Sequence, residues 1–188
     1  MDGDEAVADA ARRLTRAFRF AAERHVHQRR KGEAAEPYLN HLAEVADLVA
    51  EATGGADVDL IVAALLHDVV EDTPTSPAGV AELFGPDVAR LVAEVTDDKS
   101  LPKAERKRMQ VAHAPSRSPR AKRLKLADKI SNLRALAASP PADWSRERRL
   151  HYVEWAQAVV AGLRGTDPWL EAEFDLAAAA ALARVGSA

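Results

Sequence analysis

The segment from Leu60 to Leu66 constrains the fold more than any other part of the chain, because every residue in it is apolar. A helix that is apolar on all sides is stable only where other elements surround it, so this segment is expected in the middle of a domain. The chain has 188 residues, which is enough for a single domain with a substantial core. We therefore predict one domain over residues 1–188, built around this segment.

Composition and periodicity favour helices in the rest of the chain. Apolar residues make up 47% of it, much of that Ala and Leu, and aromatic residues only 5%. Ala and Leu favour helices, whereas aromatic and β-branched residues favour strands. No segment of useful length alternates apolar and polar residues with period two. The predicted fold is an all-α helical bundle with loop-rich connections, and helices are expected over 5–29, 37–53, 57–72, 77–84, 86–96, 103–113, 119–138, 145–164 and 167–184.

Charge, cysteine content and hydropathy exclude several classes of protein. The formal net charge of −3 gives no reason to expect a nucleic-acid partner. The absence of cysteine excludes a disulfide framework and thiolate chemistry. No apolar run reaches membrane-spanning length, and the first residues lack a signal-peptide pattern. A cytoplasmic protein that binds neither nucleic acid nor membrane is the default expectation, and the sequence predicts no oligomeric state.

The predicted helix over 57–72 ends in four ionisable side chains, His67, Asp68, Glu71 and Asp72. At about 100° per residue, these side chains fall within a sector roughly 140° wide. Carboxylates at a helix C-terminus oppose the helix dipole and repel one another, so a positive charge should offset them. A metal cation would do so, with His67 as a nitrogen ligand. The alternative is a solvated helix end with a chance His-Asp pair, and this segment alone does not decide between them.

Two residues elsewhere could complete a ligand set. His41 lies at the start of the helix that follows Pro37, where a histidine is more often a cap or a surface residue. Asp128 lies on an amphipathic helix and shares a side with Asn132, four residues further on. A single aspartate on such a helix is usually just solvated, so each residue alone is weak evidence.

Taken in order, His41, His67-Asp68 and Asp128 match the H…HD…D pattern of the HD superfamily. Further matching segments are Gln28–Lys31, Pro37–His41, Ala64–Thr73, Val95–Lys99 and Lys125–Arg134. They resemble the hydrolase domain of RelA/SpoT proteins, and most of all the stand-alone small alarmone hydrolases, which include the metazoan SpoT homologue. The resemblance covers roughly residues 6–175 and implies an HD-domain helical fold.

The resemblance also implies an activity, the hydrolysis of guanosine tetra- and pentaphosphate (ppGpp and pppGpp). Members of the family remove the 3′-pyrophosphate with Mn²⁺ and leave GDP or GTP. The positions that correspond to metal ligands are His41, His67, Asp68 and Asp128. Those that would activate and orient the attacking water are Glu71 and Asp72. Those that would contact the base, the nucleoside and nearby groups are Arg30, Lys31 and Asn132. The synthetase domain of long family members cannot fit in this chain, so hydrolysis alone is expected.

Basic residues outside this set are also candidates for binding anions. They are Lys99, Lys103, Arg106, Lys107, Arg108, Arg117, Arg120, Lys122, Arg123 and Lys125. For most of them a solvated helix face is the favoured explanation. The pair at 30–31 is better placed, because it precedes a ligand-bearing segment.

Two kinds of function compete with alarmone hydrolysis. The first is another phosphohydrolase activity, such as removal of the phosphate of NADPH or of nucleotide 5′-phosphates. The second is a catalytically idle module that senses a nucleotide. An idle module is expected to have lost ligands or the Glu71-Asp72 pair, and the presence of all six residues counts against it.

Overall fold

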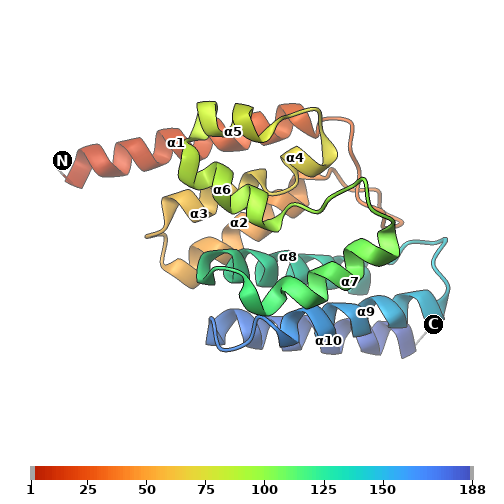
Figure 1. Ribbon diagram of the computed structural model, residues 1–188. Coiled ribbons are helices and arrows are strands. Elements are labelled where there is room, and N and C mark those ends of the chain that lie inside the picture. The colour runs from red at the N-terminus through yellow and green to blue at the C-terminus, as the bar shows by residue number, and fades with distance from the viewer. Residues whose placement is uncertain (1–2, 187–188) are drawn as a thin grey trace.

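Helices form the regular structure of residues 3–186, which are the residues that the computed structural model describes (Figure 1). The elements are α1 (Gly3–Arg24), α2 (Leu39–Thr53), α3 (Val58–Leu66), α4 (Val69–Asp72), α5 (Pro77–Phe84), α6 (Pro86–Val95), α7 (Lys103–His113), the 3₁₀ helix η1 (Ala114–Ser116), α8 (Pro119–Ala138), α9 (Arg146–Ala161) and α10 (Pro168–Gly186). These residues contain no strand, and only an isolated bridge joins Arg29 to Pro37. The prediction of an all-α fold is confirmed.

The apolar helix α3 lies in the core, as its sequence requires. Every side chain from Leu60 to Leu66 is buried. The helix packs against α1, α2 and α6, which together cover the faces that a surface helix would expose to water. The buried helix ends at the candidate ligands His67 and Asp68.

Helix α8 is the second central element. It packs against α2, α6, α9 and α10, and Figure 1 shows α9 and α10 side by side below it. Helix α7 packs against α9. Because both α3 and α8 contact α2, the three helices that carry the candidate ligands are neighbours.

Local sequence signals explain where several helices begin and end. The side chains of Asp57, Ser76 and Ser118 each accept a hydrogen bond from a backbone N–H in the first turn of α3, α5 and α8, which satisfies a donor that the helix leaves unpaired. Gly54 ends α2 in the left-handed conformation, with φ 56°, which glycine adopts without steric cost. No helix of residues 3–186 has the length and apolar character needed to cross a membrane.

Two of the predicted helices differ clearly from the observed ones. The first helix ends at Arg24, not at 29, because the chain turns over residues 25–27. The helix predicted over 57–72 is interrupted at His67 and Asp68, and α4 forms a separate turn. Adjacent residues on a regular helix do not face each other, whereas here Asp68 Oδ2 lies 3.3 Å from His67 Nε2. The interruption therefore turns the two side chains towards the same point.

Candidate metal centre and phosphate cleft

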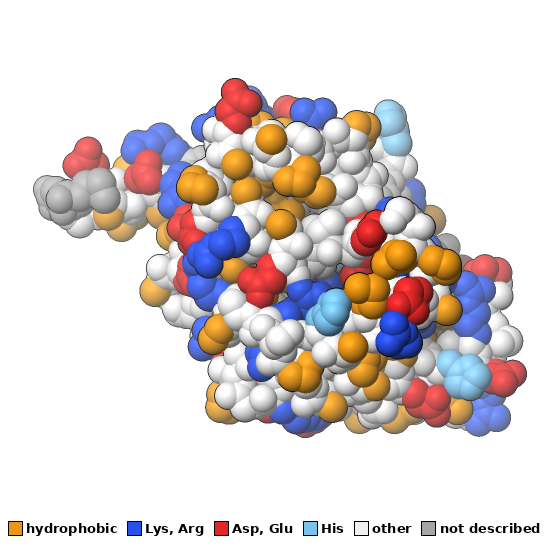
Figure 2. Space-filling view, viewed as in Figure 1, with side chains coloured by type: hydrophobic (Ala, Val, Ile, Leu, Met, Phe, Trp, Pro, Cys, Tyr) orange, Lys and Arg blue, Asp and Glu red, His pale blue; other side chains and the backbone are white. Residues whose placement is uncertain are grey.

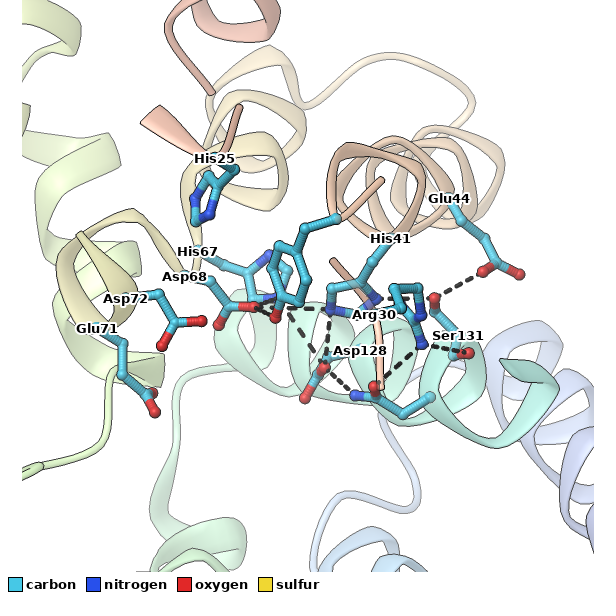
Figure 3. A network of polar contacts seen from close by, with 12 residues as sticks. His25, Arg30, His41, Glu44, His67, Asp68, Glu71, Asp72, Asp128 and Ser131 are labelled. Carbon is cyan, nitrogen blue, oxygen red and sulfur yellow. Dashed lines mark hydrogen bonds and ion pairs between the residues drawn. The ribbon is translucent and has the colours of Figure 1, made fainter. Parts of the chain in front are cut away.

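Three side chains from three helices converge in the core: His41 from α2, His67 from the end of α3, and Asp128 from α8 (Figure 3). Their relative exposures are 1%, 4% and 7%. One potential ligand atom of each lies within 4.8 Å of those of the other two. Polar groups buried in this way are costly unless they find partners, and a cation bound between the three side chains would be such a partner.

The histidine His67 presents a free ring nitrogen to this cluster. Its Nδ1 lies 2.7 Å from the backbone oxygen of Ala64. A carbonyl oxygen can only accept a hydrogen bond, so Nδ1 carries the proton and Nε2 of the neutral ring carries a lone pair. That Nε2 atom is buried and has no hydrogen-bond partner. A divalent cation at the cluster would satisfy it.

The fourth predicted ligand, Asp68, lies beside the three-residue cluster. Its Oδ2 atom is 3.7 Å from His41 Nε2 and accepts a hydrogen bond from the hydroxyl of Tyr38. Burial and the neighbouring Asp68 raise the pKa of Tyr38, so the phenol remains a donor. Two imidazoles and two carboxylates are a donor set that suits a borderline divalent ion such as Mn²⁺, Fe²⁺ or Zn²⁺.

The charges of the cluster agree with cation binding. Burial would raise the pKa of both carboxyl groups, but the neighbouring His67 lowers that of Asp68 and the neighbouring Lys129 lowers that of Asp128. Both are therefore ionised. Burial lowers the pKa of His41. Burial also disfavours charge on His67, but Asp68 and Asp128 outweigh it and raise that pKa to about 9. At neutral pH and without a cation, His67 Nε2 therefore carries a proton, which a bound cation would displace. The two carboxylates supply the negative charge that favours either one.

A cleft with a volume of about 460 Å³ opens beside the cluster. Three carboxylates, Asp68, Glu71 and Asp72, line it, and Figure 3 shows the last two on α4 to one side of the histidines. Basic side chains from the loop before α2, the loop before α7, α7 itself and α9 line it as well: Arg29, Arg30, Lys31, Lys99, Lys103, Arg106, Lys107 and Arg148. Such a concentration of cations in one cleft suits a polyanionic ligand. On the face drawn in Figure 2, by contrast, acidic and basic side chains are interspersed.

The two predicted catalytic carboxylates have different partners. Glu71 accepts a hydrogen bond of 3.2 Å from the backbone N–H of Asp97 and lies 3.5 Å from Arg106. Asp72 accepts one of 2.7 Å from the side chain of Gln28. It also pairs with Lys99. Burial and the charge of Asp68 raise the pKa of Glu71, which makes it a stronger base than an ordinary glutamate.

The three predicted substrate-binding residues all line the same cleft. Arg30 donates to the side-chain oxygen of Asn132 at 3.3 Å, and Asn132 donates to Asp128 Oδ1 at 2.6 Å. Asn132 therefore also orients a candidate metal ligand. Lys31 is exposed at the wall of the cleft.

Two groups of cleft residues were not identified from the sequence. They are the basic residues on and just before α7, and the aromatic residues on and just before α9. A solvated face was favoured for most basic residues, yet Lys99, Lys103, Arg106 and Lys107 line the cleft. The wall is completed by Trp144, Arg148, Tyr152 and Trp155. Arg148, Tyr152 and Trp155 follow one another at spacings of four and three residues, which places them on one face of α9, and Trp144 precedes that helix. That spacing, together with Lys107 over the Trp155 ring at 4.4 Å, was the signal that could have identified them.

Comparison with known proteins places the chain in a family. A model described as HD domain matches residues 17–154. The human guanosine-3′,5′-bis(diphosphate) 3′-pyrophosphohydrolase MESH1 is 52% identical over 161 residues, which cover 86% of this chain and 90% of that protein. MESH1 of Drosophila melanogaster is 50% identical over 158 residues, covering 84% and 88%.

A solved structure agrees with these relatives. It is that of a metazoan ortholog of SpoT that hydrolyzes ppGpp. It matches with a TM-score of 0.85 and 48% identity, and covers 88% of this chain and 93% of that one. The chain therefore belongs to the HD domain family and, within it, to the group formed by the MESH1 proteins.

Proposed function

We propose that the protein hydrolyses guanosine tetra- and pentaphosphate to GDP or GTP and pyrophosphate, with Mn²⁺ as its cofactor. The observation that carries the proposal is the buried His-Asp cluster at a cleft with cationic walls. The activity named for the human and fly relatives, and for the matching solved structure, supports it.

The cation would be held by His41, His67, Asp68 and Asp128. The unpartnered Nε2 of His67 and the ionised carboxylates fit such an ion. When bound, a divalent cation lowers the pKa of water and neutralises charge on a phosphate. Asn132 and Lys129 position Asp128 through hydrogen bonds of 2.6 and 3.0 Å.

Glu71 and Asp72 would orient the attacking water and accept its proton. The water oxygen forms a bond to the phosphorus that is linked to the ribose 3′ oxygen, and the bond between that phosphorus and the 3′ oxygen breaks. The 3′ oxygen regains a proton, and both phosphates leave together as pyrophosphate. The raised pKa of Glu71 suits the role of general base.

The walls of the cleft would bind the rest of the substrate. Lysine and arginine side chains of α7 and the loops pair with phosphate oxygens, since arginine matches them with two parallel donors and lysine as a point charge. Arg30 and Lys31 lie at the loop end of the cleft, and Lys107 lies over the rings of Tyr152 and Trp155, which also line it.

A substrate panel tests the proposal. Purified protein would be incubated with ppGpp, pppGpp, NADPH and nucleoside 5′-phosphates, with and without Mn²⁺. We expect GDP or GTP together with intact pyrophosphate, and no turnover after chelation. Release of single phosphates from NADPH or from a 5′-phosphate would instead assign one of the other phosphohydrolase activities. Nucleotide binding without turnover of any substrate would indicate a sensing module.

A further inference from the structure

A chain of hydrogen bonds runs away from the cluster on the side of His41 that faces away from the cation position (Figure 3). His41 Nδ1 lies 2.8 Å from the hydroxyl of Ser131 on α8. That hydroxyl donates to Glu44 Oε2 at 2.6 Å. Ser131 has a relative exposure of 0%, so its hydroxyl depends on these two side chains for its hydrogen bonds.

Proton counting fixes the direction of each bond. The ionised carboxylate of Glu44 can only accept, so the single proton of the Ser131 hydroxyl is used there. Ser131 Oγ must then accept from His41, which places the proton of the neutral imidazole on Nδ1. The lone pair is left on Nε2, the atom that lies 3.4 Å from Asp128 Oδ1 in the cluster.

The chain continues to the C-terminal helix. Arg134, three residues after Ser131 on α8, lies 3.2 Å from the other oxygen of Glu44. Its second terminal nitrogen donates to Glu173 on α10 at 2.5 Å. Arg134 thus holds the Glu44 carboxylate in place between α2 and α10, and Glu44 in turn holds the hydroxyl that His41 contacts.

We propose that Ser131 and Glu44 are positioning residues, which fix the ring orientation and the tautomer of His41 for metal binding, and that Arg134 and Glu173 hold Glu44 in place. The proposal rests on the metal site of the proposed function but is independent of the substrate. Partners of this kind behind a metal-binding histidine are typically worth about 10- to 100-fold in metal affinity. They are not expected to contact either the cation or the substrate.

The test is the Kd for Mn²⁺ of the metal-stripped full chain, measured by isothermal titration calorimetry. We expect Ser131→Ala to raise the Kd by about 10- to 100-fold. Ser131→Thr, which keeps the hydroxyl, should restore most of the affinity. Glu44→Ala should weaken binding by a similar factor, and Glu173→Gln by less, because it acts through Arg134.

Matched variants separate positioning from general effects. Asp47→Ala removes a carboxylate from the same helix as Glu44, but at an exposed position, and should leave the Kd unchanged. A second readout is the rise in the thermal midpoint when Mn²⁺ is added, which depends on affinity. A purely structural role would lower the midpoint of the metal-free protein and leave that rise intact, which would overturn the proposal.

Other outcomes are equally decisive. Wild-type affinity in both Ser131→Ala and Glu44→Ala would overturn the chain's role while leaving the metal site in place. An equal loss of Mn²⁺ affinity in Asp47→Ala and Glu44→Ala would also overturn the proposal, because the loss would then come from the change in net charge. If Ser131→Ala does not fold, the test uses Glu44→Ala, because Glu44 is partly exposed and its substitution is better tolerated. Wild-type protein that binds no Mn²⁺ would contradict the metal site itself, and with it this inference.

Discussion

Glu71 and Asp72 differ from His41, His67 and Asp128 in what they can contribute, because they line the cleft outside the buried cluster. Glu71→Gln and Asp72→Asn preserve size and hydrogen bonding but remove the proton acceptor. General-base catalysis contributes about 10²- to 10⁴-fold, so we expect turnover of ppGpp to fall by that order. Metal content, measured by elemental analysis, and the KM for substrate should change little. Unchanged turnover in both variants would remove these residues from the mechanism.

His67 is the residue at which metal content is most directly tested. The wild-type protein should contain about one transition ion per chain, in keeping with a single ligand set. His67→Ala removes the unpartnered Nε2 and leaves the ionised Asp68 and Asp128 with less compensation. We expect loss of both the ion and the activity, with the same result for Asp68→Ala. A variant that keeps normal metal content would show that its residue is not a ligand.

At the scale of elements, the sequence predicted the helices well and their interruptions poorly. The apolar segment 60–66 and the prolines and glycines between helices mark the order of elements. The break at His67-Asp68 carries neither proline nor glycine, and it follows from tertiary contacts such as the hydrogen bond of Tyr38 to Asp68. The candidate metal ligands stood out in the sequence because their residue types and order are distinctive. The α7 lysines were not, because a basic helix face looks the same whether it faces water or a cleft.

Two lysines of α7 should make the activity fall as the pH becomes alkaline. Burial and neighbouring cations lower the pKa of Lys103 and Lys107. A lysine with a lowered pKa becomes neutral at a lower pH than usual, so its attraction for phosphate is lost sooner as the pH rises. We expect kcat/KM to fall on the alkaline side, below the ordinary lysine pKa of about 10.4. Lys107→Arg stays charged and should shift this fall upward, and an unchanged profile would exclude Lys107.

The loop that carries Arg30 and Lys31 packs closely against the end of α8 through Gly32. A Cβ atom on Gly32 would lie 2.2 Å from the backbone oxygen of Ser139. Gly32→Ala must therefore displace the loop, and a misplacement of about 1 Å can cost roughly 100-fold in rate. We expect a markedly lower kcat/KM with unchanged metal content. Gly3→Ala, whose Cβ meets nothing within 4 Å, is the control, and a similar loss there would contradict this explanation.

At the scale of the whole molecule, the core around α3 should dominate stability. Leu66 is fully buried on a helix that packs against α1, α2 and α6. Removing most of such a side chain typically costs about 2–5 kcal/mol, from lost burial and from the cavity left behind. We expect Leu66→Ala to lower the free energy of unfolding by that amount, as measured by urea denaturation. Leu176→Ala, at an exposed position on α10, should change it little, and equal effects would contradict a core centred on α3.

The cluster takes His41, His67 and Asp128 from three separate helices. These residues are synthesised one after another, so the cluster cannot form until the last of them has been made. A growing chain exposes both histidines well before the segment with Asp128 has been made. Synthesis adds about 5–20 residues per second, and a domain generally folds as a unit. The nascent chain therefore passes through an interval of several seconds with both histidines and Asp68 but without Asp128. Cation binding by the complete candidate ligand set would therefore have to wait until α8 has packed against α2.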